Sequence, residues 1–213
     1  MSDKPFKEEA QQAWLWWSRL QPREAEGRMI PGDRAAVARL KRAANIMEAA
    51  AEPATGDLYE KLGRANPDDV RRNFSKEEAT QDLPRAALLA AVLAHVRDDD
   101  RKNKSVAEAI GAPRGGEDTT ALITPIRFKR LVAAREADDL LIAFRRVVAI
   151  LGKTANVKDL AMQLLAWTDP DDRTADIART RFAFAYHGAS RYAPDLKTSE
   201  NPTVSANEED RPQ

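Results

Sequence analysis

The side chains best suited to a chemical role in this sequence are arginines that recur in short clusters beside apolar residues. Residues 124–153 contain two clusters, RFKR with Arg127, Lys129 and Arg130, and FRR with Arg145 and Arg146. A guanidinium group stays protonated and binds phosphate oxygens through paired N–H donors. If the apolar faces of two such helices pack together, the arginines are displayed outward. The pattern therefore predicts a surface that contacts a phosphate backbone.

A third arginine cluster lies in the segment GDRAAVARLKR. Arg39 and Arg42 are three residues apart, so they share one side of a helix, and Arg34 lies nearer the boundary of the apolar face. A solvated helix face explains these residues as well as a phosphate contact does, because surface arginine is common. Near the end of the chain, Arg179 and Arg181 are expected to add further outward charge.

Acidic clusters offer a different chemistry. Asp98–Asp100 and Asp169–Asp172 carry carboxylates of the kind that hold Mg²⁺ in nucleases and hydrolases, although loop acids beside Lys and Arg are more often solvated turns. The sequence has no cysteine and only two histidines, His95 and His187, which leaves little for a zinc site or a histidine-based triad. We therefore assign no catalytic residue, no metal ligand and no cofactor.

The elements that position these residues are predicted to be helices throughout. Thr124 and Pro125 suit the start of one helix, and an apolar stripe from Leu140 to Leu151 predicts the next. One alanine-rich helix is expected from Arg34 to about residue 51, and residues 83–96 are apolar nearly all round, as in a buried central helix. A first helix over residues 8–21 contains three tryptophans, of which at least one is expected to meet a partner or a second layer.

These patterns predict an all-α protein of about eight or nine helices in two packed helical bundles. The helical domain is expected to span residues 1–190, with sub-bundles at 1–97 and 123–190. Residues 191–213 lack apolar periodicity and are predicted to be a disordered tail.

Composition fits a globular chain. Its 213 residues include 43% hydrophobic and 32% charged residues, and 34 basic residues balance 34 acidic ones. A uniformly basic nucleic-acid binder is thus not indicated, but the clustering of positive charge permits a basic stripe on a neutral protein. No run approaches the roughly 20 apolar residues of a membrane span. We expect a cytoplasmic protein that does not contact a membrane.

Four segments in order carry a family resemblance: WLWWSRLQ, PGDRAAVARLKRA, RFKRLVAAREADDLLIAFRRVVAIL and LLAWTDPDDRTADIARTRFAFAYHGA. Over roughly residues 14–190 the chain resembles the CRISPR-associated CasB family, the small subunit of type I-E Cascade. The resemblance implies an all-helical, non-catalytic protein, present as a homodimer in a crRNA-guided surveillance complex beside the backbone subunits and the large subunit. It also implies basic surfaces that help hold the target strand and the displaced (non-target) strand of the R-loop during antiviral defence.

Mapped by motif, the basic face that the resemblance implies consists of Arg34, Arg39, Arg42, Arg127, Lys129, Arg130, Arg145 and Arg146. Two other functions stay open. One is a helical adaptor that binds only protein, with the tryptophan-rich first helix as its docking face. The other is a metal-dependent enzyme built on the aspartate clusters. The charge pattern alone supports a nucleic-acid-binding subunit and a protein-binding adaptor about equally. The family resemblance favours the nucleic-acid-binding subunit.

Overall fold

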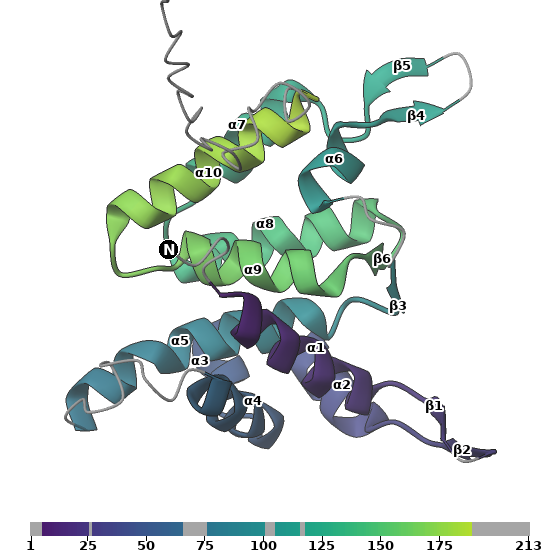
Figure 1. Cartoon of the computed structure of the whole chain (residues 1–213), viewed down its shortest axis with the longest axis vertical. Coiled ribbons are helices and arrows are strands. Elements are labelled where there is room, and N and C mark those ends of the chain that lie inside the picture. Colours follow the sequence, from purple (N-terminus) through teal and green to yellow (C-terminus); the bar gives the residue numbers. More distant parts are fainter. Residues whose placement is uncertain (1–5, 26, 66–75, 101–104, 116–117, 189–213) are drawn as a thin grey trace, which may run out of the picture.

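The computed structural model describes residues 6–25, 27–65, 76–100, 105–115 and 118–188, and this part of the chain is built almost entirely of helices (Figure 1). The predicted all-α class is confirmed, with ten helices in the described residues in place of the expected eight or nine. The predicted disordered tail, residues 191–213, lies outside the described residues.

The helices are α1 (Lys7–Leu20), α2 (Arg34–Arg42), α3 (Ile46–Ala50), α4 (Pro53–Ala65), α5 (Lys76–Leu93), α6 (Val106–Gly111), α7 (Pro125–Ala133), α8 (Ala137–Ile150), α9 (Val157–Trp167) and α10 (Asp172–Tyr186). Three short strand pairs join them: β1 (Arg23–Ala25) with β2 (Arg28–Ile30), β3 (Asp98–Asp99) with β6 (Thr154–Ala155), and β4 (Pro113–Gly115) with β5 (Asp118–Ala121). The first and last pairs are antiparallel hairpins, and β3–β6 is parallel.

Helix α5 is the centre of the core. Every residue from Ala86 to Leu93 has no exposed surface, as predicted for a helix that is apolar on all sides. It packs against α3 and α4 on the N-terminal side of the sequence and against α8 and α9 on the C-terminal side, while α1 also packs on α9. The expected sub-bundles at 1–97 and 123–190 therefore share one apolar core.

The three tryptophans of α1 all bond within the chain. Trp16 and Trp17 are buried, and their indole N–H groups donate to the carbonyls of Ala54 and Val96. Trp14 is half-buried and donates to the Asp99 carboxylate at 2.8 Å. A second layer within the chain, formed by α4, α9 and the end of α5, therefore meets these side chains.

The helix expected from Arg34 to about residue 51 is two helices, α2 and α3, which is a correction to the sequence prediction. Asn45 begins α3 by accepting a hydrogen bond from the Glu48 N–H. Across the break, Asp138 of α8 accepts from the Ile46 N–H at 2.8 Å. The Ala44 N–H donates to the Glu48 carboxylate at 2.7 Å. This local cap and the contact with α8 take the place of the helical hydrogen bonds that a continuous helix would make at residues 44 and 46.

Helix α7 packs against α8 and against α10, and Figure 1 shows it behind α10. Thr124 and Pro125 occupy the cap and first positions as predicted, although the Thr124 side chain makes no capping hydrogen bond. Phe128 of α7 stacks on Tyr186 of α10 with ring centroids 3.7 Å apart, which fixes the two helices together. Among the described residues, no helix has the length and apolar character needed to cross a bilayer.

Candidate nucleic-acid interface

Three of the predicted arginines meet in one groove between α7 and α8. The groove has a volume of about 710 Å³, and Arg127 and Arg130 enter it from α7 while Arg146 enters it from α8. All three side chains are exposed. Of the described residues that line it, Asp139 is the one acid. The rest of the lining is apolar: Ile123, Leu131, Ala133, Ala134, Ile142, Ala143, Val147, Ala149 and Ile150.

Helical geometry explains this convergence. Arg127 and Arg130 are three residues apart, so they lie on one side of α7, next to the side that buries Phe128 and Leu131. On α8 the buried stripe includes Val147 and Val148. Arg146 precedes that stripe by about 100° of rotation and therefore borders the groove.

Arg145, the neighbour of Arg146, is placed differently from the other predicted contacts. Its Nη1 donates to the Ala43 carbonyl at 2.8 Å and its Nη2 to the Leu40 carbonyl at 3.0 Å. These are carbonyls at the C-terminal end of α2, which a cation stabilises through both hydrogen bonding and the helix dipole. The side chain is half-buried, and burial lowers the pKa of Arg145. In this structure Arg145 caps a helix.

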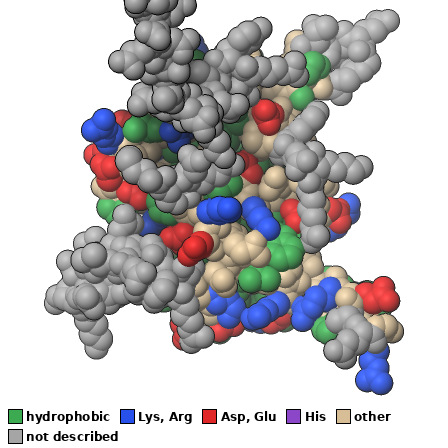
Figure 2. Space-filling model, viewed as in Figure 1, with side chains coloured by type: hydrophobic (Ala, Val, Ile, Leu, Met, Phe, Trp, Pro, Cys, Tyr) green, Lys and Arg blue, Asp and Glu red, His purple; other side chains and the backbone are tan. Residues whose placement is uncertain are grey.

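The three predicted arginines of α2 lie on a separate exposed surface. Arg34 and Arg42 are exposed, and Arg39 donates through Nε to Glu52 at 2.7 Å. Figure 2 shows Lys and Arg side chains following one another along the lower edge of the view, where Figure 1 places α2 and the β1–β2 hairpin. No α2 residue lines the α7–α8 groove. Lys129 is exposed on α7, outside the groove lining.

Sequence reasoning missed a basic cluster at the junction of α2, α5 and α8. Lys153 follows α8, and its carbonyl accepts from the Arg97 N–H at 2.8 Å, close to the end of α5. The pKa of His95 is lowered to about 4, first by burial and then by the positive charges of Arg145, Lys41 and Lys153. Burial and Lys153 also lower the pKa of Lys41. No spacing in the sequence reveals this cluster, because its members come from three distant segments.

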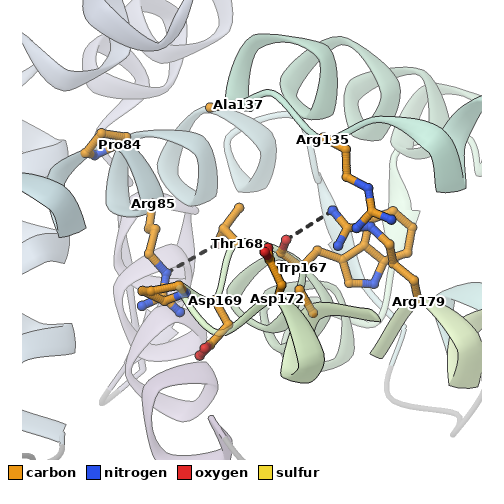
Figure 3. Close-up of a pocket in the computed structure, with 11 residues that line it drawn as sticks. Pro84, Arg85, Arg135, Ala137, Trp167, Thr168, Asp169, Asp172 and Arg179 are labelled. Atoms are coloured by element: carbon orange, nitrogen blue, oxygen red, sulfur yellow. Dashed lines mark hydrogen bonds between the residues drawn. The ribbon is translucent and has the colours of Figure 1, made fainter. Parts of the chain in front are cut away.

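Arg179 also corrects a sequence expectation, because it is buried rather than outward, with 4% of its surface exposed. Its Nη2 donates to the carbonyls of Trp167 and Ala134, at the ends of α9 and α7. Arg85 donates through its own Nη2 to the Leu165 carbonyl at 2.8 Å. Figure 3 shows these two arginines on opposite sides of the turn that follows α9, around a pocket of about 360 Å³. Both therefore hold the end of α9 in place.

The aspartate clusters considered for Mg²⁺ binding have structural partners. Asp171 begins α10 by accepting from the N–H groups of Arg173 and Thr174, and its own N–H donates to Asp169. Asp99 accepts from Trp14 and from the Val157 N–H at the start of α9. Within the described ranges, no group of three or more His, Asp or Glu side chains is placed to hold a metal ion. These carboxylates stabilise helix starts and turns.

The model of the family described as CRISPR-associated protein Cse2 (CRISPR_cse2) matches residues 36–187, more than half of the chain. The chain belongs to the Cse2 family. Cse2, for which CasB is an alternate name, is the small subunit of type I-E Cascade, a structural component of CRISPR defence. The sequence resemblance is confirmed. The matched range includes both helices of the groove and every predicted contact except Arg34.

No curated protein and no solved structure matches the Cse2 chain. Membership in the family implies association with other Cascade components.

Proposed function

We propose that this Cse2 chain is a non-catalytic Cascade subunit that binds nucleic-acid backbone and stabilises the target and displaced DNA strands of the R-loop. The observation that carries the proposal is the α7–α8 groove, where Arg127, Arg130 and Arg146 converge and Asp139 is the one acid among the described lining residues. Their positive charge, and not base recognition, would supply the affinity, because phosphate contacts carry no sequence information.

The energetics of strand exchange explain why such contacts matter. The RNA–DNA hybrid formed in an R-loop is about as stable as the DNA duplex that it replaces, so small contributions decide the outcome. Arginines that neutralise phosphates of an unpaired strand release counterions and favour the open state. Sequence recognition is then left to the crRNA.

The exposed arginines of α2 form a second contact surface in this proposal. Arg34 and Arg42 are unobstructed, whereas Arg39 is held by Glu52 and Arg145 by the α2 carbonyls. We assign the groove residues and Lys129 the main role, α2 a supporting one, and Arg145 the role of positioning α2. The partners proposed are crRNA, both DNA strands, the backbone and large subunits of Cascade, and a second copy of this chain.

The test is fluorescence anisotropy of labelled single-stranded DNA across salt concentrations, with the full chain and with the reconstituted complex. Changing Arg127, Arg130 and Arg146 together to Ala is expected to weaken binding and to reduce the log–log salt slope by about 2, since each phosphate contact on a single strand contributes about 0.7. A charge-matched control changes the exposed residues Lys7, Arg97 and Lys158 to Ala. Equal losses in both variants would refute the groove as the binding surface.

The adaptor hypothesis makes the opposite prediction for the same variant. A chain that binds only protein would assemble normally and leave DNA affinity unchanged when the three groove arginines are removed. The tryptophan-rich first helix, which this hypothesis takes as the docking face, packs inside the protein instead. The indole N–H groups of Trp14, Trp16 and Trp17 all donate to acceptors in the same chain.

A further inference from the structure

One aromatic side chain of α10 is left on the surface. Phe184 is 58% exposed, whereas Phe182 and Tyr186 of the same helix are 2% and 6% exposed. In the described part of the chain it is the one aromatic residue among the exposed large hydrophobic side chains. Fully burying a phenylalanine is worth about 1.5–3 kcal/mol, and this ring, with more than half of its surface exposed, contributes only part of that to the fold. The ring is available to a binding partner.

Phe184 borders an open groove between α7 and α10. The groove has a volume of about 500 Å³, and Val132 of α7 is among the residues that line it. Its other lining residues are Arg135, Asp176, Arg179, Thr180, Ala183 and His187. The one acid among the described lining residues, Asp176, accepts from Arg135 Nη1 at 2.7 Å, so its charge is already paired. A planar apolar group can therefore reach the ring without facing an unpaired carboxylate.

The surroundings of Phe184 are basic. One exposed side of α10 carries Arg173, Ile177, Arg181 and Phe184. Successive members of this set are four, four and three residues apart, which is the spacing of side chains on one face of a helix. Lys129 is exposed on α7, three residues before Val132. This combination of an aromatic ring with flanking cations is the arrangement that binds unpaired nucleic acid, where bases stack and phosphates are neutralised.

Helix α7 connects this surface with the α7–α8 groove. Arg127 and Arg130 face α8, and Val132 faces α10. A helix with its side chains is about 10–12 Å across, so a strand that crosses α7 from the arginines reaches Phe184 within a few nucleotides. Figure 1 shows α7 and α10 side by side, which the stacking of Phe128 on Tyr186 maintains.

We propose that Phe184 is a stacking platform for an unpaired nucleobase of the strand held by the α7 arginines. This inference rests on the proposed function and adds a base contact to its backbone contacts. It gives Cse2 a preference for unpaired over duplex nucleic acid without recognition of sequence, because every base has an aromatic face.

The experiment compares two labelled oligonucleotides of equal length, ordinary single-stranded DNA and an abasic strand with the same phosphates. Phe184→Ala is expected to weaken binding of the ordinary strand roughly 5- to 150-fold, the loss typical of one base–aromatic stack. Binding of the abasic strand and the salt slope are expected to stay unchanged. The Phe184→Trp variant should bind the ordinary strand about as well as the wild type does, because tryptophan also offers an aromatic face for stacking. Ile177→Ala, a second exposed apolar residue on the same face, serves as the matched control.

The outcomes separate this inference from the proposed function. Equal losses on both oligonucleotides, or no loss on either, would overturn stacking at Phe184 while leaving the arginine groove intact. Impaired assembly of the complex with unchanged DNA affinity would identify the ring as a protein contact and also overturn the inference. If the wild-type chain and complex bind neither strand, the proposed function fails and the stacking platform fails with it.

Discussion

Arg145 and Arg146 are adjacent in sequence, yet they belong to two regions with different physical roles. Arg145 faces the α2–α8 junction, where its guanidinium donates to two carbonyls of α2. Arg146 faces the α7–α8 groove, where it is exposed beside Arg127 and Arg130. Successive residues of a helix point about 100° apart, so one arginine caps a neighbouring helix while the next one faces a solvent-exposed groove. An arginine pair in sequence is thus not necessarily a pair in function.

The junction holds two helix ends against α8. Arg145 stabilises the last carbonyls of α2, while Asp138 accepts from the Ile46 N–H at the first residue of α3. Each charge lies where the helix dipole favours it, a cation at a C-terminus and a carboxylate at an N-terminus. The arginines of the groove, by contrast, are exposed to solvent. Stability should therefore depend on the junction and nucleic-acid affinity on the groove.

The largest expected effect follows from breaking the junction. Arg145→Ala leaves the Leu40 and Ala43 carbonyls without their donors, and we expect it to lower the free energy of unfolding by about 2–3 kcal/mol. Arg146→Ala should change it by less than about 0.5 kcal/mol, because the side chain is exposed. Urea unfolding followed by circular dichroism measures both. Similar losses in the two variants would contradict the division of roles.

A second effect at the junction depends on pH. The folded-state pKa of His95 is about 4, below its ordinary value of 6.5, mainly because of burial. Between these values the unfolded chain binds a proton that the folded chain does not, so stability is full above pH 6.5 and falls as the pH drops toward 4. Allowing for solvent screening of a half-buried group, we expect a loss of about 1–2 kcal/mol.

Urea unfolding at pH 7 and pH 5 tests the His95 prediction. His95→Gln should show a smaller loss of stability between these pH values than the wild type, because the titrating group is gone. His187→Gln is the control, since His187 is exposed at the end of α10 and lies far along the chain from the junction. A wild-type pH dependence that both variants retain would show that other groups cause it.

The fold was largely predictable because helix periodicity is local. The apolar residues of α5 and α8 identify those helices and their buried sides, and Pro125 marks the start of α7. The break between α2 and α3 has one local signal, Asn45 with Glu48 three residues later, which the prediction of a continuous helix overlooked. The contacts with Asp138 and Arg145, about 100 residues away, could not be read from the sequence. Alanine-rich sequence favours a continuous helix, and the tertiary contacts override that preference.

The sequence predicted that the candidate site consists of arginines, but it did not predict which arginines line the groove. Arg127, Arg130 and Arg146 converge as expected for an arginine-bearing pair of amphipathic helices. Arg145 and Arg179 carry the same sequence signal, but their donors are used on helix carbonyls. Which arginines keep their donors available depends on which helix ends lie nearby, and that information resides in the packing.

The smallest expected effect sharpens the groove side of the comparison. In the described part of the chain, Asp139 is the one acid that lines the α7–α8 groove, and it lies in the first turn of α8. Asp139→Asn removes a charge that opposes phosphate binding, so we expect the affinity for single-stranded DNA to rise roughly 2- to 5-fold at low salt. Asp138→Asn is the matched control, because Asp138 faces the Ile46 N–H at the junction.

Anisotropy titrations of the two aspartate variants at several salt concentrations decide the point. The gain from Asp139→Asn should shrink as salt rises, because screening weakens the repulsion that the substitution removes. Asp138→Asn should leave DNA affinity unchanged, since an amide oxygen can still accept from the Ile46 N–H. If Asp138→Asn raises affinity as much as Asp139→Asn does, both carboxylates act through the net charge of the molecule. That result would contradict the α7–α8 groove as the surface that binds the strand.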